Sequence, residues 1–277
     1  MSTASIDLDA SINSGQVFLW TKCDHIWYGV NGQDIIKMSA ESPACPASQA
    51  AYDFFRMSDD YSSILDGLSS CDDTIRYAIE RYRGLRLLRQ DPFQCLITFI
   101  ASSNSSIPNI RRSLQRLCSE FGRRLDLDGQ EYVLFPEAQA LARADAGEIR
   151  RCGLGYRAKY VQAAANMVYD GTLDLRRLRS SGYDATREAL LETPGVGDKV
   201  ADCVMLFSLE KLDAFPLDRW MGRVISRYYP EMAPGGHLTP RIYTRMHNSL
   251  AEYFGPNAGY AQQFLFKMQR DEVHSTW

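Results

Sequence analysis

The feature that most constrains the fold is a tight turn with the sequence PGVG at residues 194–197, set between two stretches with helical spacing. Glycine allows positive φ and lets the backbone come close to a ligand, so both glycines are expected to use that freedom. The unpaired N–H groups at the start of the second helix favour an anion. We therefore expect a helix-hairpin-helix at about residues 184–209, in which Gly195, Gly197 and Val200 contact a nucleic-acid phosphate.

The first part of the chain has the pattern of a small antiparallel sheet. Short apolar or alternating runs at residues 17–20, 25–30 and 34–38 are separated by turn signals, including Asn31-Gly32. Such runs, bounded by turn residues, are typical of strands joined by hairpins.

After residue 49 the apolar spacing becomes helical. Residues 92–102 are a mostly apolar stretch, with Asp91 placed to cap the helix and Pro92 at its first position. Further helices are expected at residues 110–121, 137–145, 146–152, 156–169, 184–192, 199–209, 219–228, 239–253 and 257–269. The sequence thus predicts an α+β protein, mainly α, with an N-terminal β-rich domain at residues 1–85 and a helical body at residues 86–277.

The charges are unevenly distributed along the chain. The net charge of −3 argues at first against a nucleic-acid partner. Residues 1–75, however, hold eleven acidic and three basic side chains, whereas the remainder holds 23 acidic and 28 basic ones. Phosphate binding needs local positive potential rather than a basic protein. Taken alone, the arginine clusters in the second part are explained as solvated helix faces.

The cysteines and apolar runs exclude several classes. Seven cysteines are scattered without a C-x-x-C pair, which favours reduced thiols over a disulfide framework or a zinc site. No apolar run is long enough to span a membrane, and the first residues lack a secretory signal. We expect an intracellular monomer, in the nucleus of a eukaryote or in the cytoplasm or nucleoid of a prokaryote, with no cofactor, no metal and no membrane partner.

Two residues indicate covalent chemistry. Lys199 lies in the first turn of the second hairpin helix, where the helix dipole disfavours a positive charge. A neutral amine is the nucleophile that forms Schiff bases. Asp218 precedes the helix at 219–228 and should cap it, and a carboxylate there can also stabilise a cationic sugar. Cys203 shares a helix face with Lys199, although a buried structural cysteine explains it equally well.

Together with other motifs, this segment resembles the 8-oxoguanine DNA glycosylase/lyase family, of eukaryotic type, in the helix-hairpin-helix glycosylase superfamily. Several separated motifs in the same order make the resemblance more specific than the hairpin alone. It covers nearly the full length and is strongest in SGQVFLW (14–20), RLLRQDPFQCLITFIASSN (86–104), GLGYRAKYV (153–161), LLETPGVGDKVADCVMLFSL (190–209), FPLD (215–218) and GPNAGYAQQFLF (255–266).

The resemblance implies a reaction on a flipped-out nucleotide of double-stranded DNA. An enzyme of this kind takes 8-oxoguanine out of the base stack, because C1′ is shielded within the duplex. Lys199 would attack C1′, expel the base and hold the sugar as a Schiff base. Asp218 would stabilise the developing oxocarbenium ion, and β-elimination would then nick the strand.

The same resemblance implies a pocket for the base. The flipped base would lie between Phe266 and Cys203, with Phe207 nearby. Gln262 would read the Watson–Crick edge, because an amide both donates and accepts. Gly15 would offer its carbonyl to the N7–H that 8-oxoguanine has and guanine lacks, which is worth about 1–3 kcal/mol of discrimination.

On the opposite strand, the resemblance assigns three further contacts. Asn104 would fill the gap left by the flipped base, Tyr156 would wedge between bases, and Arg157 would bind the orphaned cytosine. Without the resemblance, Tyr156 and Arg157 are explained as the start of a helix with a solvated arginine.

The chain departs from the family pattern at three positions. Asn109 stands where an arginine often contacts the opposite cytosine, which predicts relaxed selectivity for that base. Trp220 stands at a usual histidine position, and Leu19 replaces a common arginine.

Two alternatives remain. A related glycosylase with another substrate is one, although no cysteine follows Cys203 to hold an iron–sulfur cluster, and alkyl-base glycosylases usually lack the equivalent of Lys199. The other is a non-enzymatic DNA-binding module that uses the hairpin for affinity, for which neither Lys199 nor Asp218 is needed.

Overall fold

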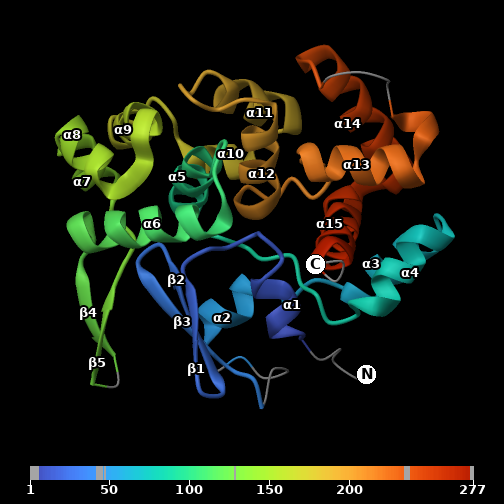
Figure 1. Cartoon of the computed structure of the whole chain (residues 1–277), viewed down its shortest axis with the longest axis horizontal. Coiled ribbons are helices and arrows are strands. Elements are labelled where there is room, and N and C mark those ends of the chain that lie inside the picture. Colours follow the sequence, from blue (N-terminus) through green and yellow to red (C-terminus); the bar gives the residue numbers. More distant parts are fainter. Residues whose placement is uncertain (1–5, 42–45, 47, 128, 234–237, 275–277) are drawn as a thin grey trace.

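The computed structural model describes residues 6–41, 46, 48–127, 129–233 and 238–274. Within them, helices form most of the molecule, and a small antiparallel sheet built from the first strands lies at one end (Figure 1). The predicted class, α+β and mainly α, is confirmed. No helix in these ranges is both long and apolar enough to cross a membrane.

Three strands form a meander in sequence order, β1 (Trp20–Cys23), β2 (Ile26–Asn31) and β3 (Asp34–Ser39). Asn31 pairs with Asp34, and Gly32 has a φ of 62°, so the predicted Asn31-Gly32 turn is confirmed.

The strand predicted at residues 17–20 is wrong, because the chain enters β1 only at Trp20. Side-chain hydrogen bonds hold this segment instead of a ladder. The Gln16 amide accepts the N–H of Leu88 at 2.8 Å and donates to the carbonyl of Arg86 at 2.9 Å. The segment therefore follows residues 86–90 without pairing as a strand.

The helices form two groups along the chain. Those before the hairpin are α1 (Leu8–Ile12), α2 (Gln49–Phe54), α3 (Tyr61–Ser69), α4 (Asp73–Arg81), α5 (Pro92–Ser102), α6 (Ile107–Phe121), α7 (Ala138–Arg143), α8 (Ala146–Ile149), α9 (Ala158–Tyr169) and α10 (Leu175–Ser180). Those from the hairpin onward are α11 (Tyr183–Leu191), α12 (Asp198–Ser208), α13 (Arg219–Tyr228), α14 (Pro240–Phe254) and α15 (Ala258–His274).

Some elements differ from the sequence expectation. Helices α1 and α10 and a two-stranded hairpin, β4 (Arg124–Leu127) with β5 (Gln130–Val133), were not predicted. The hairpin strands have four residues each, and although Arg124–Leu127 alternates between polar and apolar side chains, such a short run is a weak strand signal. Between α8 and α9, Gly153 at a φ of 90° breaks what the spacing indicated as nearly continuous helix.

Helix α5 lies at the centre of the core. Asp91 accepts the N–H of Gln94 at 2.8 Å and Pro92 occupies the first turn, as predicted. The helix is buried on nearly all sides and packs against α12 and α9. It thus forms the support on which the second hairpin helix rests.

The core divides into two apolar clusters. The smaller one joins the sheet to α2, with Trp20, Ile36 and Phe54 among its members. The larger one fills the helical body and also takes in the buried faces of α3 and α4, which pack toward α15. The domain boundary near residue 85 stays a prediction.

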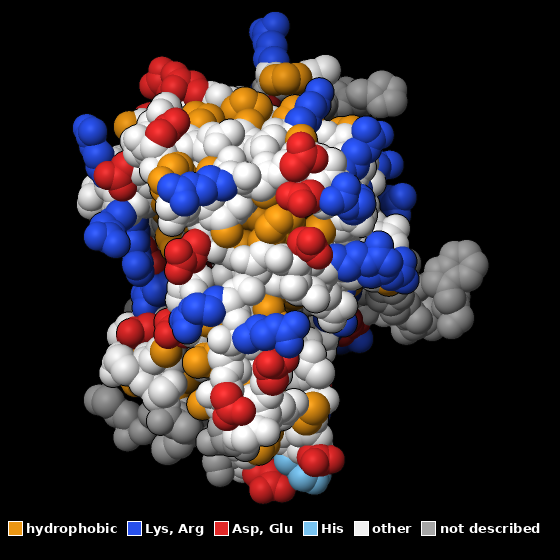
Figure 2. Space-filling view, turned by 90° about the vertical axis from the view of Figure 1, so that its left-hand side faces the viewer, with side chains coloured by type: hydrophobic (Ala, Val, Ile, Leu, Met, Phe, Trp, Pro, Cys, Tyr) orange, Lys and Arg blue, Asp and Glu red, His pale blue; other side chains and the backbone are white. Residues whose placement is uncertain are grey.

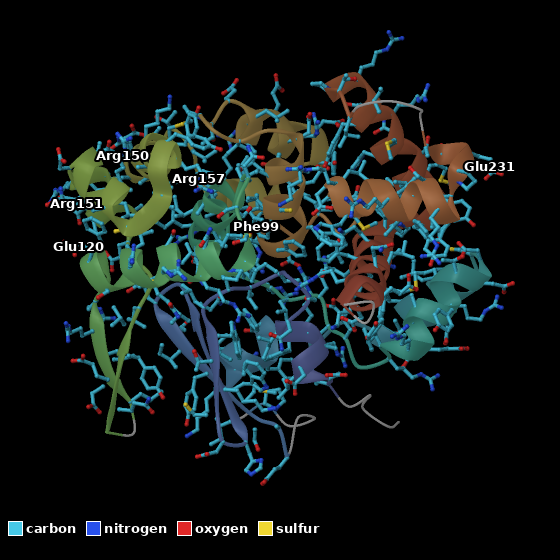
Figure 3. All side chains as sticks on the ribbon, viewed as in Figure 1. Phe99, Glu120, Arg150, Arg151, Arg157 and Glu231 are labelled. Atoms are coloured by element: carbon cyan, nitrogen blue, oxygen red, sulfur yellow. The ribbon has the colours of Figure 1, made fainter. Side chains whose placement is uncertain are left out.

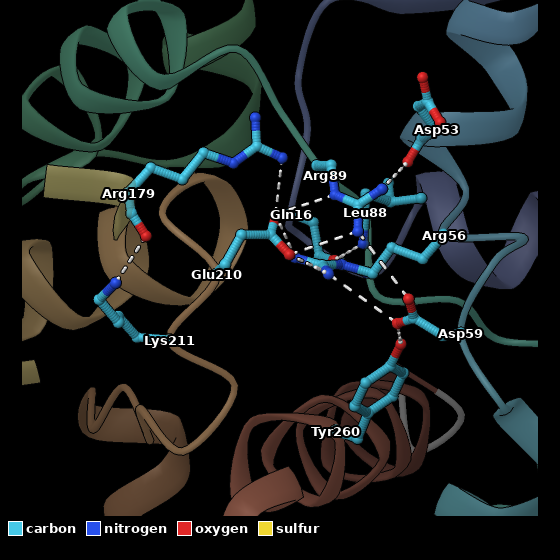
Figure 4. Close-up of polar contacts among 10 residues, drawn as sticks. All are labelled: Gln16, Asp53, Arg56, Asp59, Leu88, Arg89, Arg179, Glu210, Lys211 and Tyr260. Atoms are coloured by element: carbon cyan, nitrogen blue, oxygen red, sulfur yellow. Dashed lines mark hydrogen bonds and ion pairs between the residues drawn. The ribbon is translucent and has the colours of Figure 1, made fainter. Parts of the chain in front are cut away.

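A group of charged side chains joins the N-terminal part of the chain to the helical body (Figure 4). Glu210, just after α12, accepts hydrogen bonds from Arg56 at 2.7 Å and from Arg89 at 2.8 Å. Burial opposes ionisation of Glu210, yet the hydrogen bond from Arg89 and the charge of Arg56 lower its pKa to about 2. Asp59 lies 3.8 Å from Arg56 and accepts the Tyr260 hydroxyl of α15 at 2.7 Å.

The surface around α6 to α9 carries mixed charge. Figure 2 shows this face, where Lys and Arg side chains are spread among Asp and Glu side chains rather than gathered into one field. Arg151, for example, lies 3.8 Å from Glu148. This supports the explanation of solvated helix faces for this part of the basic charge.

Candidate functional site

The hairpin connects α11 to α12 through a tight turn. Gly195 has a φ of 85°, and a Cβ at this position would lie 2.5 Å from Cγ of Tyr160, so both the backbone and the space require glycine. Gly197 has a φ of −109°, and a Cβ there would meet nothing within 4 Å. The expectation of positive φ is therefore correct for Gly195 and wrong for Gly197.

The start of α12 has no side-chain cap. Gly197 occupies the cap position, so the cap residue has no side chain to accept the first N–H groups of the helix. Val200 is buried, which leaves only its backbone to face outward. Asp198 pairs with Arg187 of α11 and fixes the two hairpin helices together. Unpaired N–H groups at a rigid helix start can bind a phosphate.

Lys199 is half-buried against a wall of aromatic rings. Its Nζ lies 4.9 Å from the centroid of the Phe99 ring, which comes from α5 and is labelled in Figure 3. Phe99 stacks on Phe207 with ring centroids 5.4 Å apart and meets Phe18 edge-on at 6.3 Å. The wall keeps the amine in an apolar environment on one side.

Cys203 lies close both to this amine and to Asp218. Burial raises the pKa of the Cys203 thiol to about 12, the nearby positive charge of Lys199 opposes that shift, and the carboxylate of Asp218 adds to it. The thiol is therefore neutral and is not a nucleophile. Three of the predicted residues thus meet at one point from α12 and the start of α13.

Asp218 is the cap of α13, as predicted. Its Oδ1 accepts the backbone N–H groups of Trp220 and Met221, each at 2.9 Å. Both bonds fix the carboxylate at the helix start.

A buried hydrogen-bond network ties the loop before Asp218 to α12. The Tyr243 hydroxyl, from α14, donates to the carboxylate of Asp202 and accepts the backbone N–H of Leu217 at 3.2 Å. Asp202 is fully buried, and burial raises its pKa, against the lowering influence of its neighbours.

His247 holds the same loop from one turn further along α14. Its Nε2 accepts the backbone N–H of Phe215 at 3.2 Å. The Tyr183 hydroxyl lies between the two anchors, 2.8 Å from Nε2 of His247 and 3.1 Å from the carboxylate of Asp202. Side chains of α11, α12 and α14 thus fix the backbone that carries Asp218.

The predicted base-pocket residues from the two ends of the chain also meet. A Cβ on Gly15 would lie 3.2 Å from both Cε1 of Phe266 and Nη1 of Arg270, so these side chains pack directly on the glycine. Gln262 donates to the carbonyl of Pro216 at 3.2 Å, and its amide oxygen accepts from Gln263 at 2.7 Å. To read a base edge, Gln262 must exchange these internal contacts.

The three residues predicted to face the opposite strand form a separate cluster. Asn104 has a φ of 50° and its amide lies 3.4 Å from the hydroxyl of Tyr156, which is 54% exposed. Arg157 donates to the backbone carbonyls of Ala101 and Ser103 at 3.1 and 2.8 Å. Its alternative description as a solvated arginine is therefore wrong, because it holds the end of α5.

Other basic residues near Arg157 in sequence lie elsewhere. In Figure 3, Arg150 and Arg151 lie at the outer edge near Glu120, whereas Arg157 lies toward Phe99. Asn109 is exposed and receives a hydrogen bond from Arg112 at 3.4 Å. Trp220 has the guanidinium of Arg223 5.3 Å from its ring centroid.

Sequence reasoning missed several residues of the site. Phe99 gave no signal, because it is one apolar residue on an apolar helix. Tyr243 and His247 did give one, since polar groups four positions apart share a helix face that is otherwise apolar. Among the described residues, no group of three or more His, Cys, Asp or Glu side chains could hold a metal ion.

Family comparisons cover almost the whole chain. Residues 1–96 match the 8-oxoguanine DNA glycosylase N-terminal domain, and residues 97–240 match the HhH-GPD superfamily of base excision DNA repair proteins.

Individual relatives agree. The N-glycosylase/DNA lyase OGG1 of Arabidopsis thaliana is 32% identical over 96% of this chain and 78% of its own length. A probable N-glycosylase/DNA lyase of Methanothermobacter thermautotrophicus is also 32% identical, over 72% of this chain and 68% of its own. The Clostridium acetobutylicum 8-oxoguanine glycosylase/lyase, in complex with DNA containing cytosine opposite 8-oxoguanine, superposes with a TM-score of 0.87 at 29% identity, over 97% of this chain and 93% of that one.

Proposed function

We propose a covalent mechanism for this chain, which belongs to the 8-oxoguanine DNA glycosylase family within the HhH-GPD superfamily of base excision DNA repair proteins. It is a bifunctional enzyme that excises 8-oxoguanine from duplex DNA and cleaves the strand at the resulting site. The assignment of each step to named residues is our proposal.

The covalent step belongs to Lys199. One observation carries this assignment: the amine lies against Phe99 and beside the neutral thiol of Cys203, which is also within the field of Asp218. The amine attacks C1′ of the extruded nucleotide, and the bond from C1′ to N9 breaks. The attacking nitrogen loses a proton, and its lone pair then opens the sugar by breaking the bond from C1′ to O4′, whose oxygen takes up a proton, so that a Schiff base is left at C1′. Loss of a proton from C2′ then expels the 3′ phosphate and nicks the strand.

Asp218 stabilises the positive charge that develops on the sugar. Its carboxylate is fixed by two backbone N–H groups, so it needs no reorganisation when the charge appears. A fixed anion beside the amine fits a reaction that passes through a cationic sugar.

The base pocket lies between the two ends of the chain. Phe266 packs on Gly15 and supplies a ring on which a purine can stack, while Cys203 supplies the opposite wall. The Gly15 carbonyl accepts the N7–H of 8-oxoguanine, and Gln262 reads the other edge after releasing Pro216.

Two parts of the protein bind the DNA. The N–H groups at the start of α12, next to Gly195 and Gly197, bind a phosphate without reading sequence. Asn104 and Tyr156 enter the gap left in the duplex, and Arg157 presents its guanidinium at that end of α5.

A comparison of damaged bases tests the substrate. Single-turnover base release is measured on duplexes with 8-oxoguanine, thymine glycol or 3-methyladenine, with wild type and Lys199→Gln. Lys22→Gln, on the distant strand β1, is the control for loss of a lysine. We expect release of 8-oxoguanine by wild type and the control only. Equal or faster release of the other two bases would identify a glycosylase for another lesion.

A further inference from the structure

A small cavity adjoins Gly15 on the side of α6 and the end of α15. It has a volume of about 180 Å³ and its walls combine apolar side chains with two guanidinium groups. The apolar part comes from Ile12, Val17, Phe18 and Ile107, and the charged part from Arg111 and Arg270.

The two arginines lack a matching anion. No carboxylate lines the cavity, and within the described part of the chain neither arginine takes part in an ion pair. Arg270 donates to the backbone carbonyl of Asn13 at 3.0 Å, and Arg111 lies 3.5 Å from the side-chain oxygen of Asn13. Nε of Arg111 is buried and has no hydrogen-bond partner among the residues that the structure describes. Unpaired buried donors and neighbouring like charges both cost free energy.

The pKa of Arg270 reflects its burial and its charged neighbours. Burial lowers the pKa of Arg270, the carboxylates of Asp271 and Asp218 oppose this shift, and repulsion from Arg111 adds to it. Two cations that repel each other in a half-buried cavity are stabilised when a negative charge enters between them.

The cavity borders the proposed base pocket. Arg270 and Phe266 pack together on Gly15, and the guanidinium lies 5.8 Å from the centroid of the Phe266 ring. A base stacked on Phe266 with an edge toward Gly15 therefore has the two guanidinium groups at that edge.

We propose that Arg270 and Arg111 form an anion site for the departing purine, which holds the negative charge of 8-oxoguanine as its bond to the sugar breaks. The Nζ lone pair forms the bond to C1′, and the electron pair of the bond from C1′ to N9 leaves with the base. The base thereby gains a negative charge, which its ring delocalises toward the imidazole edge and O8. The proton lost from the attacking nitrogen is sufficient to neutralise the released base.

The walls favour a purine over a backbone phosphate. Ile12, Val17 and Phe18 are each less than 10% exposed, and a flat anion with delocalised charge tolerates such apolar surroundings. A phosphate concentrates its charge and retains water, for which these walls offer no partner. The cavity also lies beside Gly15, away from the uncapped start of α12 where the phosphate is assigned.

This inference rests on the proposed function. Two substrates distinguish a failure of the inference from a failure of the proposed function. Arg270→Gln and Arg111→Gln remove the charge at nearly constant size, Arg270→Lys retains it, and Arg241→Gln on the exposed face of α14 is the control. Each is compared on duplex with 8-oxoguanine opposite cytosine and on duplex with a preformed abasic site. The abasic duplex needs the lysine but releases no base.

We expect the Gln variants to slow base release by on the order of 10- to 100-fold. Nicking and borohydride trapping on the abasic duplex should stay within about twofold of the wild-type rate. No base leaves in that reaction, so loss of the anion site does not raise its barrier. Arg270→Lys should recover part of the loss, and free 8-oxoguanine should inhibit wild type more strongly than Arg270→Gln.

Three other outcomes are decisive. Equal losses on both substrates would assign the anion to a DNA phosphate and overturn the inference. Unchanged base release in both Gln variants would overturn it as well. If wild type neither releases the base nor is trapped on the abasic duplex, the proposed function itself fails.

Discussion

The Tyr243 hydroxyl joins Asp202 on α12 to the backbone N–H of Leu217, the residue before Asp218. The helix that carries the amine and the loop that carries the carboxylate are thus bound to the same oxygen atom. The relative position of this helix and this loop therefore depends on a buried side chain of α14.

Tyr243→Phe should uncouple helix α12 from the loop that carries Asp218. It keeps the ring, removes one of the hydrogen bonds to the buried carboxylate of Asp202 and leaves the buried N–H of Leu217 without this acceptor, at a cost of about 1–3 kcal/mol in the free energy of unfolding. Base release should slow by about tenfold, because a small displacement of a positioned group is costly. Tyr253→Phe, which removes an exposed hydrogen bond to Asp72, is the control. Equal rates for the two variants would show that Tyr243 has no positioning role.

The two hairpin glycines should respond differently to alanine. Gly195→Ala introduces a Cβ against Tyr160 at a φ of 85°, which costs about 1–3 kcal/mol and should weaken DNA binding. Gly197→Ala adds a Cβ in open space at an allowed φ and should change stability by no more than about 1 kcal/mol. Thermal unfolding and titration of a duplex with an abasic analogue measure both effects. Similar behaviour of the two variants would contradict the hairpin geometry.

Glu210 should make the fold sensitive to acid. Folding lowers its pKa from 4.5 to about 2, so its stabilisation is fully present above pH 4.5 and is lost as the pH falls toward 2. The shift corresponds to about 3 kcal/mol. Glu210→Gln should therefore destabilise the protein at pH 7 and flatten the loss of stability in this range.

Denaturant unfolding between pH 2 and 7 measures this effect. Glu131→Gln is the control, because its partner Arg124 is exposed and such pairs contribute little. A wild-type profile that is as flat as that of Glu210→Gln would refute the assignment.

Asn109 should relax the choice of opposite base. It is exposed and offers a short amide where the family pattern has a long cation, so the orphaned cytosine loses a charged donor. Base release from 8-oxoguanine opposite cytosine, adenine, guanine and thymine should differ less than in Asn109→Arg. A strong preference of wild type for cytosine would reject this prediction.

Local chemistry was predictable from the sequence. The caps Asp91 and Asp218, the Asn31-Gly32 turn and the two hairpin helices each depend on residues within a few positions of one another. Lys199 and Cys203 could be placed on one face because they share a helix.

Contacts between distant segments were not predictable in the same way. Phe99 reaches the site through the packing of α5, and nothing local marks it. Tyr243 and His247 share a helix face, which is a local signal, but their partners depend on how α14 packs. The φ of Gly197 was misjudged because a helix cap in extended geometry needs no left-handed residue. Resemblance to a family supplied Gly15 and Phe266, whereas Arg111 and Arg270 became visible only through the cavity that they line.

The central claim is that Lys199 forms the covalent bond to the sugar. Borohydride trapping on 8-oxoguanine duplex, followed by peptide mass spectrometry of the cross-link, tests it most directly. We predict one trapped species in wild type, with the sugar adduct on Lys199, and none in Lys199→Gln, although that variant should still bind the duplex. An adduct on another residue, or trapping of Lys199→Gln at the wild-type level, would contradict the mechanism.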